Sequence, residues 1–186
     1  MMKEELNSLK KELFKELKSN AFFREKITLS SGKRANYYID CRMVTLSSKG
    51  SYLSAKIILA MIKQENIAAV GGPTLGADPL VGAIATLGYL NKAPINTFIV
   101  RKAPKLHGKM RRIEGPQIKK GSRVIVIDDV ATTGKSILEA VEVLRQDGIK
   151  VDKAIVIVDR QEGAAHNLTK KNCSLISIFK ASEFLK

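Results

Sequence analysis

The sequence has 186 residues, of which 45% are hydrophobic, so it can form one domain with a substantial core but not two ordinary domains. Lysine and arginine total 32 against 18 acidic residues, and the formal charge of +14 favours an anionic partner: nucleic acid, an acidic membrane surface or a phosphorylated small molecule. No apolar run approaches the ~20 residues that cross a bilayer, and none follows the charged N-terminus as in a secretory signal.

The first third of the chain is expected to hold two helices on either side of a turn and a strand. The first helix is amphipathic, because leucines recur at helical spacing among glutamates and lysines: Leu6, Leu9, Leu13 and Leu17. Residues 27–42 indicate a turn at Ser31 and Gly32 that leads into a strand. The second helix is predicted from about residue 48 to 63.

From residue 67 onward, short apolar strands alternate with helices. The predicted strands are 67–70, 96–100, 124–127, 154–158 and 175–179, and the predicted helices are 77–88 and 135–146. Residues 71–73, Gly-Gly-Pro, could be a simple turn after the first of these strands. Alternation of this kind indicates βαβ units, and therefore an α/β fold with a mostly parallel central sheet flanked by helices.

Residues 102–121 interrupt this alternation as a long connection without clear periodicity. Such long loops in compact domains are usually functional or disordered. Six basic residues and no acidic residue occur within residues 101–112, at its start: Arg101, Lys102, Lys105, Lys109, Arg111 and Arg112. The cluster could bind an anion, or it could be an ordinary solvated surface run.

The segment VIVIDDVATTGKS, residues 124–136, carries the strongest functional signal. A buried strand ends in Asp128 and Asp129, a loop with Gly134 follows, and a helix begins. Ligands of open parallel sheets bind at the carboxyl ends of strands, and a helix N-terminus offers free N–H groups to a phosphate. The two acids suit hydroxyl groups beside that phosphate, such as a ribose diol, or a positive charge that develops on the sugar.

Three other structures could in principle underlie this segment. A Walker A loop requires glycine at position 129, where the chain has aspartate, so it is rejected. A response-regulator pocket, in which aspartates hold a metal and accept a phosphoryl group, leaves the Thr-Thr-Gly-Lys-Ser loop unexplained. An ordinary strand-to-helix turn with threonine as N-cap remains open.

The segment resembles the PRPP-binding signature of type I phosphoribosyltransferases. The resemblance implies that Asp128 and Asp129 hold the ribose hydroxyls and that residues 132–136 cradle the 5′-phosphate. The PRPP-binding residues that it implies are Arg101, Lys102, Lys105, His107, Asp128, Asp129, Val130, Ala131, Thr132, Thr133, Gly134, Lys135 and Ser136.

Four further segments are similar to the orotate phosphoribosyltransferases, in the right order: 27–42, GPTLG at 72–76, RKAPKLHG at 101–108 and DRQEG at 159–163. The resemblance implies a type I phosphoribosyltransferase fold with a small N-terminal hood. Residues 1–186 would form a single domain, with 1–45 and the C-terminal end in the hood and 102–115 as a mobile catalytic loop. Many members carry lysine where this chain has Ser30 and Gly76.

The chemistry of the reaction suits these residues. The base attacks C1′ of PRPP, pyrophosphate leaves, and the basic loop can neutralise or protonate the leaving group. The expected catalytic residues are Lys105, His107, Asp128 and Asp129. Orotate is expected to contact Thr132, Arg160, Tyr37, Tyr38 and Lys33, with the arginine on its carboxylate. Mg²⁺ is the expected cofactor, held mainly by substrate and water rather than by direct protein ligands.

Partners and location are also predicted. By resemblance the enzyme is a homodimer whose basic loop reaches into the neighbour's site, with PRPP and orotate as substrates and neither membrane nor nucleic acid as a partner. A purine phosphoribosyltransferase and a PRPP-sensing nucleic-acid regulator are the alternatives. Cys41 and Cys173 lie in no metal or disulfide pattern, which favours a reducing cytoplasm.

Overall fold

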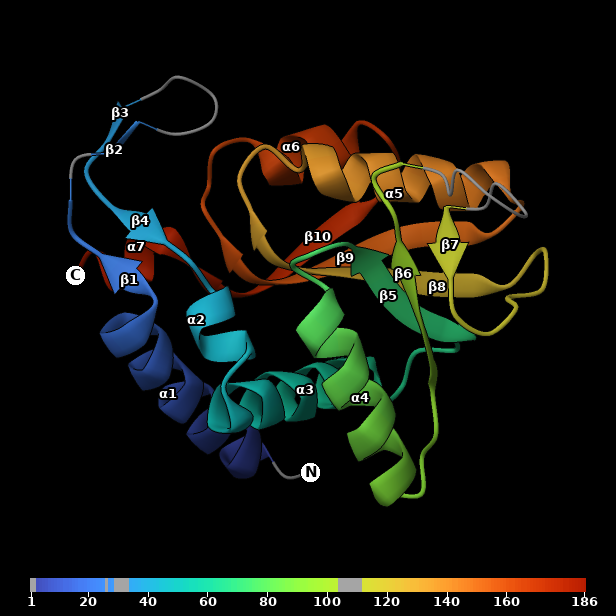
Figure 1. Ribbon diagram of the computed structural model, residues 1–186, viewed down its shortest axis with the longest axis horizontal. Helices are drawn as coiled ribbons and strands as arrows, with labels where there is room; N and C mark the ends of the chain where they lie inside the picture. Colours follow the sequence, from blue (N-terminus) through green and yellow to red (C-terminus); the bar gives the residue numbers. More distant parts are fainter. Residues whose placement is uncertain (1–2, 26, 29–33, 104–111) are drawn as a thin grey trace.

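A computed structural model describes residues 3–25, 27–28, 34–103 and 112–186, and its centre is a six-stranded sheet (Figure 1). The strand order is β10-β9-β8-β5-β6-β7, and every pair is parallel except β6 with β7. The strands are β10 (Ser174–Lys180), β9 (Lys150–Asp159), β8 (Arg123–Ala131), β5 (Ala69–Pro73), β6 (Asn96–Val100) and β7 (Ile113–Glu114). The predicted α/β fold with a mostly parallel sheet is confirmed.

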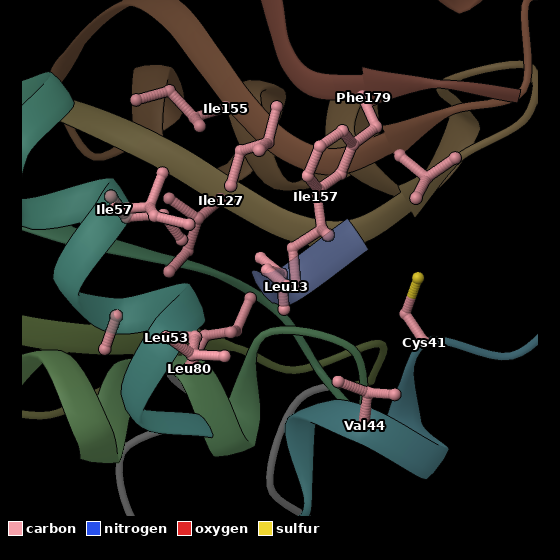
Figure 2. Packing of buried hydrophobic residues seen from close by; sticks show 14 of the residues in the cluster. Leu13, Cys41, Val44, Leu53, Ile57, Leu80, Ile127, Ile155, Ile157 and Phe179 are labelled. Atoms are coloured by element: carbon pink, nitrogen blue, oxygen red, sulfur yellow. The ribbon is translucent and has the colours of Figure 1, made fainter. Parts of the chain in front are cut away.

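Helices cover both faces of the sheet and create two cores. One face is covered by α1 (Lys3–Asn20), α3 (Ser48–Ile62) and α4 (Asp78–Leu90), and the other by α5 (Lys135–Gln146) and α6 (Ala164–Thr169) (Figure 1). Figure 2 shows the first core, where Leu53, Ile57 and Leu80 from the helices lie beside Ile127 and Ile155 of the sheet. β8 and β9 are buried on both faces, which is why their sequences are nearly continuous runs of β-branched residues.

The N-terminal segment forms small elements beside the main sheet. They are β1 (Phe22–Phe23) paired with β4 (Tyr38–Ile39), β2 (Ile27–Thr28) paired with β3 (Arg34–Ala35), and α2 (Arg42–Thr45). The short C-terminal helix α7 (Ala181–Phe184) lies against them. The division into a hood and a catalytic body stays an interpretation.

Stacked aromatic rings join this segment to the two ends of the fold. Phe184 of α7 stacks on Phe14 of α1, with ring centroids 4.7 Å apart, and on Phe22 of β1, at 5.8 Å. Phe22 in turn stacks on Tyr37 at 5.7 Å. Each such contact adds about 0.5–1.5 kcal/mol beyond burial, so the position of Tyr37 depends on both terminal helices.

The alternative interpretation of residues 71–73 as a simple turn is wrong. Gly71, Gly72 and Pro73 continue strand β5, and a Cβ on Gly72 would lie 1.8 Å from the carbonyl oxygen of Ile127 on β8. Glycine is present because the neighbouring strand backbone leaves no room for a side chain. α2, α6, α7 and β7 were not predicted, since each is very short. No helix in the described ranges is long and apolar enough to cross a bilayer.

Candidate active site

The site lies where the strand order of the sheet reverses. The chain leaves β5 through α4 to reach β6 on one side, and later returns to place β8 on the other side of β5. Loops that leave β5 and β8 therefore diverge and open a crevice at the carboxyl edge, which is where open α/β sheets bind ligands. The predicted pyrophosphate loop, residues 72–76, comprises the end of β5 and the residues that follow it, and the loop after β8 belongs to the predicted phosphate loop.

Asp128 and Asp129 lie at this point of reversal, within the last four residues of strand β8 rather than in the following loop. Asp128 is buried; its Oδ1 accepts a hydrogen bond of 2.9 Å from the Asp129 N–H, and its Oδ2 accepts one of 3.2 Å from the Ser136 hydroxyl. The Asp129 Oδ1 accepts a bond of 2.7 Å from the Val130 N–H. These bonds fix both carboxylates in one orientation.

Gly76 brings the pyrophosphate loop directly against these acids. A Cβ built on Gly76 would lie 2.1 Å from Oδ1 of Asp128 and 2.4 Å from Oδ1 of Asp129. Only a residue without a side chain allows this approach. The loops after β5 and β8 therefore meet across the crevice, and the two acids form its floor.

Burial weakens the ionisation of both acids. Burial, followed by the charge of Asp129, raises the pKa of Asp128 well above its ordinary value. Burial also raises the pKa of Asp129, although the N–H of Val130 and the guanidinium of Arg42 act in the opposite direction. A positive charge beside the two carboxylates would offset this cost of burial, so the pair is suited to a charge that develops on a ligand and, as hydrogen-bond acceptors, to hydroxyl groups.

The phosphate loop is shaped by glycine and supported by α6. Gly134 has φ of +78° and is the N-cap of α5, and no side chain caps that helix, so the interpretation of threonine as N-cap is wrong. The N–H groups of the first turn are therefore open to an anion. The Nδ2 of Asn167 donates a bond of 2.9 Å to the carbonyl of Thr133, which fixes the loop from behind. Asn167 was not predicted as a residue of the site, because no sequence motif includes it.

The other predicted residues of the phosphate loop lie around this turn. Val130 and Thr132 are half-buried, Ala131 is buried, and Thr133, Lys135 and Ser136 are exposed. The backbone N–H of Arg160 donates a bond of 2.9 Å to the carbonyl of Ala131. This bond places the start of the phosphate loop on β8 directly beside the segment that follows β9.

The basic loop begins and ends on neighbouring strands. β7 pairs with β6, and beyond this pair the Arg101 N–H donates 2.8 Å to the Arg112 carbonyl while the Arg112 Nε donates 3.0 Å to the Arg101 carbonyl. The Thr74 N–H donates to the Val100 carbonyl at 3.2 Å, so this stem rises beside the pyrophosphate loop. Arg101 and Lys102 are exposed at the stem. The predicted ligands Lys105, His107 and Lys33 lie outside the described residues.

Arg160 and Tyr37 are brought together, whereas Tyr38 faces a different group. The Arg160 side chain is buried, its Nε donates 2.8 Å to Glu162, and its Cζ lies 5.0 Å from the ring centroid of Tyr37. The Tyr38 hydroxyl is 3.5 Å from the carboxylate of Asp40.

Asp40 is in turn held by two charge-assisted bonds from Arg42, of 2.8 and 2.9 Å, which lower the pKa of Asp40. The charge of Arg42 also acts on Asp129, so this pair borders the site. Neither Asp40 nor Arg42 was among the site residues predicted from the sequence.

Comparisons with known proteins agree with this geometry. The family model described as phosphoribosyl transferase domain matches residues 48–184. The orotate phosphoribosyltransferase of Aquifex aeolicus is 45% identical over 157 residues, covering 84% of this chain and 85% of the relative. That of Thermosynechococcus vestitus is 43% identical over 182 residues, covering 98% and 96%. The crystal structure of Mycobacterium tuberculosis orotate phosphoribosyltransferase in complex with PRPP is 31% identical, has a TM-score of 0.79 and covers 96% of this chain and 99% of that chain.

The family match covers most of the chain, the relatives align over nearly their full length, and the acids and loops stand at the point of strand reversal. The chain belongs to the phosphoribosyltransferase family, among its orotate phosphoribosyltransferase members.

Proposed function

We propose that the protein transfers ribose 5-phosphate from PRPP to orotate, forming orotidine 5′-monophosphate and pyrophosphate in pyrimidine biosynthesis. One observation carries the proposal: a diol-binding acid pair and an uncapped phosphate loop follow β8, and a buried arginine follows the adjacent strand β9. The bond between Arg160 N–H and Ala131 carbonyl fixes the spacing of these two groups. A phosphorylated sugar and a carboxylated base would then lie side by side.

PRPP binding uses the groups at the end of β8. The N–H groups of the first turn of α5 and the side chains of Thr132, Thr133 and Ser136 would bind the 5′-phosphate. Asp128 and Asp129 would accept hydrogen bonds from the ribose hydroxyls and stabilise the cationic character that grows at C1′ as the bond to pyrophosphate breaks. The short bonds that already fix both acids mean that little reorganisation is needed in that step.

The leaving group would be held between the pyrophosphate loop and the basic loop. Arg101 and Lys102 stand at the stem of the basic loop, and Lys105 and His107 would neutralise or protonate the departing pyrophosphate. Mg²⁺, held mainly by substrate oxygens and water, would supply positive charge that offsets the charge of the leaving group. The oxygen donors of Asp128 and Asp129 beside the diol fit a hard cation, and within the described residues no group of three His, Cys, Asp or Glu could cage a metal.

Orotate would lie over the end of β9. The Arg160 guanidinium would bind its carboxylate, with Thr132, Lys33, Tyr37 and Tyr38 around the ring. The base is the nucleophile, and its ring nitrogen attacks C1′ as pyrophosphate leaves.

We also infer a homodimer in which the basic loop of one protomer completes the site of the other. Exposed apolar side chains support the presence of an interface: Met43, Leu46, Leu75, Tyr89 and Leu90. Mixing a Lys105→Ala variant with an Asp128→Asn variant tests this arrangement. If the loop acts across the interface, hybrid dimers contain one intact site and regain activity, whereas a loop that acts within its own protomer gives no recovery.

A base-consumption assay tests the activity itself. The protein is mixed with PRPP, Mg²⁺ and, in separate reactions, orotate, uracil, adenine, guanine or hypoxanthine. Orotate should be consumed, with the rate abolished by a chelator and restored by added Mg²⁺. Turnover of a purine and none of orotate would refute the proposal. The two free, buried cysteines suit the cytoplasmic location that we propose.

A further inference from the structure

Arg160 is a deeply buried arginine of the site, and one of its buried guanidinium nitrogens has no hydrogen-bond partner among the described residues. Its side chain is 4% exposed, and its Nε is paired with Glu162. Its Nη2 is buried and has no hydrogen-bond partner among the residues that the structure describes. A buried unpaired donor is costly, and a guanidinium with one free edge is complementary to a carboxylate that arrives from outside the chain.

Glu162 is fixed on a rigid turn. Gln161 has φ of +61° and Gly163 has φ of +105°, the N–H of Gln161 donates 2.8 Å to Asp159, and the Oε1 of Gln161 accepts 3.2 Å from the Ser182 N–H of α7. The Glu162 carboxylate is therefore held on one side of the guanidinium, only two residues away in sequence. Its bond to Nε leaves the terminal nitrogens as the available edge.

Tyr37 fixes the plane of the same guanidinium. Its ring lies under Cζ at 5.0 Å, a distance within the range of a cation–π contact. The ring cannot turn freely, because Phe22 stacks on it and Phe22 in turn stacks on Phe184, which is fully buried. Glu162 therefore fixes the direction in which the guanidinium points, and Tyr37 fixes the tilt of its plane.

We infer that Glu162 and Tyr37 are positioning residues that set the preference of this enzyme for a carboxylated pyrimidine, by holding the terminal nitrogens of Arg160 toward the base. The inference rests on the proposed function. A base with a carboxylate satisfies the buried nitrogen, and a base that lacks one leaves it unpaired, so selectivity follows from the fixed orientation. If Arg160 could rotate, its terminal nitrogens could be satisfied by solvent, and the distinction between a carboxylated and an uncarboxylated base would shrink.

The test measures kcat and KM for orotate, uracil and PRPP in Glu162→Ala and Tyr37→Leu. In both variants KM for orotate should rise about tenfold, the effect of one misplaced charge-assisted bond, while KM for PRPP stays unchanged. The ratio of kcat/KM for orotate to that for uracil should fall by the same factor. Glu162→Gln and Tyr37→Phe, which keep the acceptor and the ring, should recover most of the ratio.

Matched controls carry the same substitutions in similar contacts away from the site. Glu12→Ala breaks an exposed pair with Lys49, and Tyr52→Leu removes the ring under Lys56, and neither should change the ratio. An unchanged ratio in Glu162→Ala overturns the inference, and so does an equal rise of KM for PRPP and orotate. If Tyr37→Leu does not fold, Glu162→Ala and its Gln counterpart decide the question. Absence of orotate turnover in the unmodified protein is a failure of the proposed function and is seen before any variant is made.

Discussion

Replacing Gly76 by alanine should damage both stability and PRPP binding. Gly76 has no left-handed backbone, so the effect is purely steric. The added Cβ would lie 2.1 Å from Asp128 Oδ1 and 2.4 Å from Asp129 Oδ1, whereas real Cβ atoms essentially never come within 3.0 Å of another atom. The nearer oxygen must therefore move by at least 0.9 Å, the difference between 3.0 and 2.1 Å.

The size of the effect follows from what holds the two acids. Each oxygen that would be displaced accepts a backbone hydrogen bond, from Asp129 N–H or from Val130 N–H. Loss of two bonds at about 1 kcal/mol each, together with some overpacking, gives a destabilisation of roughly 2–3 kcal/mol. For a chain of this length that corresponds to a fall in Tm of roughly 5–10 °C. The displaced acids should also raise KM for PRPP at least tenfold, by loss of about one charged hydrogen bond.

Thermal unfolding and steady-state kinetics measure these effects, with Gly82→Ala as the control. Gly82 lies in the exposed interior of α4, and a Cβ there meets nothing within 4 Å. Alanine at that position should stabilise the protein by about 0.5–1 kcal/mol and leave KM for PRPP unchanged. A Gly76→Ala variant with the Tm and PRPP affinity of the unmodified protein would show that the carboxylates can move aside freely, and the reasoning from the crevice floor would be refuted.

Three further changes test the site and its support. Because burial and Asp129 raise the pKa of Asp128, the folded state holds that proton more tightly than the unfolded chain. This group therefore contributes stability that is complete below the ordinary pKa of 3.8 and is lost as pH rises through the raised folded pKa. Asp128→Asn should reduce the fall of unfolding free energy with pH and raise Tm at pH 8, while PRPP turnover falls; an unchanged dependence of unfolding free energy on pH would contradict this. Asn167→Ala removes the bond to Thr133 and should raise KM for PRPP about fivefold with KM for orotate unchanged, and steady-state kinetics showing equal shifts would refute a specific role. Arg145→Ala removes hydrogen bonds to three backbone carbonyls and should lower the unfolding free energy by about 2 kcal/mol in denaturant titrations, without an effect on either KM.

Periodicity in the sequence was sufficient to predict the main helices and strands. The predicted helix at 135–146 and strand at 96–100 match α5 and β6, because strong patterns of burial decide long elements. Strand β8 runs through Asp128 and Asp129, which were predicted to end it, since pairing with Val156 and β9 outweighs the low strand preference of aspartate. β5 likewise includes Gly71 and Gly72. Their place in the strand depends on close contact with the backbones of β6 and β8, and such long-range contacts cannot be predicted from a local pattern.

The candidate site was predicted only where residues follow a motif. Asp128, Asp129 and the phosphate loop were found, and the structure brings them to one crevice. The supporting residues Asn167 and Glu162 were missed as such, because each acts through a partner distant in space or through a side-chain orientation that no local pattern encodes. The roles of Lys33, Lys105 and His107 stay predictions.

The stack of Phe184 on Phe14 and Phe22 bears on how the protein is made. A ribosome produces Phe14 and Tyr37 long before it produces Phe184. The ring beneath Arg160 therefore reaches its full support only once α7 has been made and has packed onto α1 and β1.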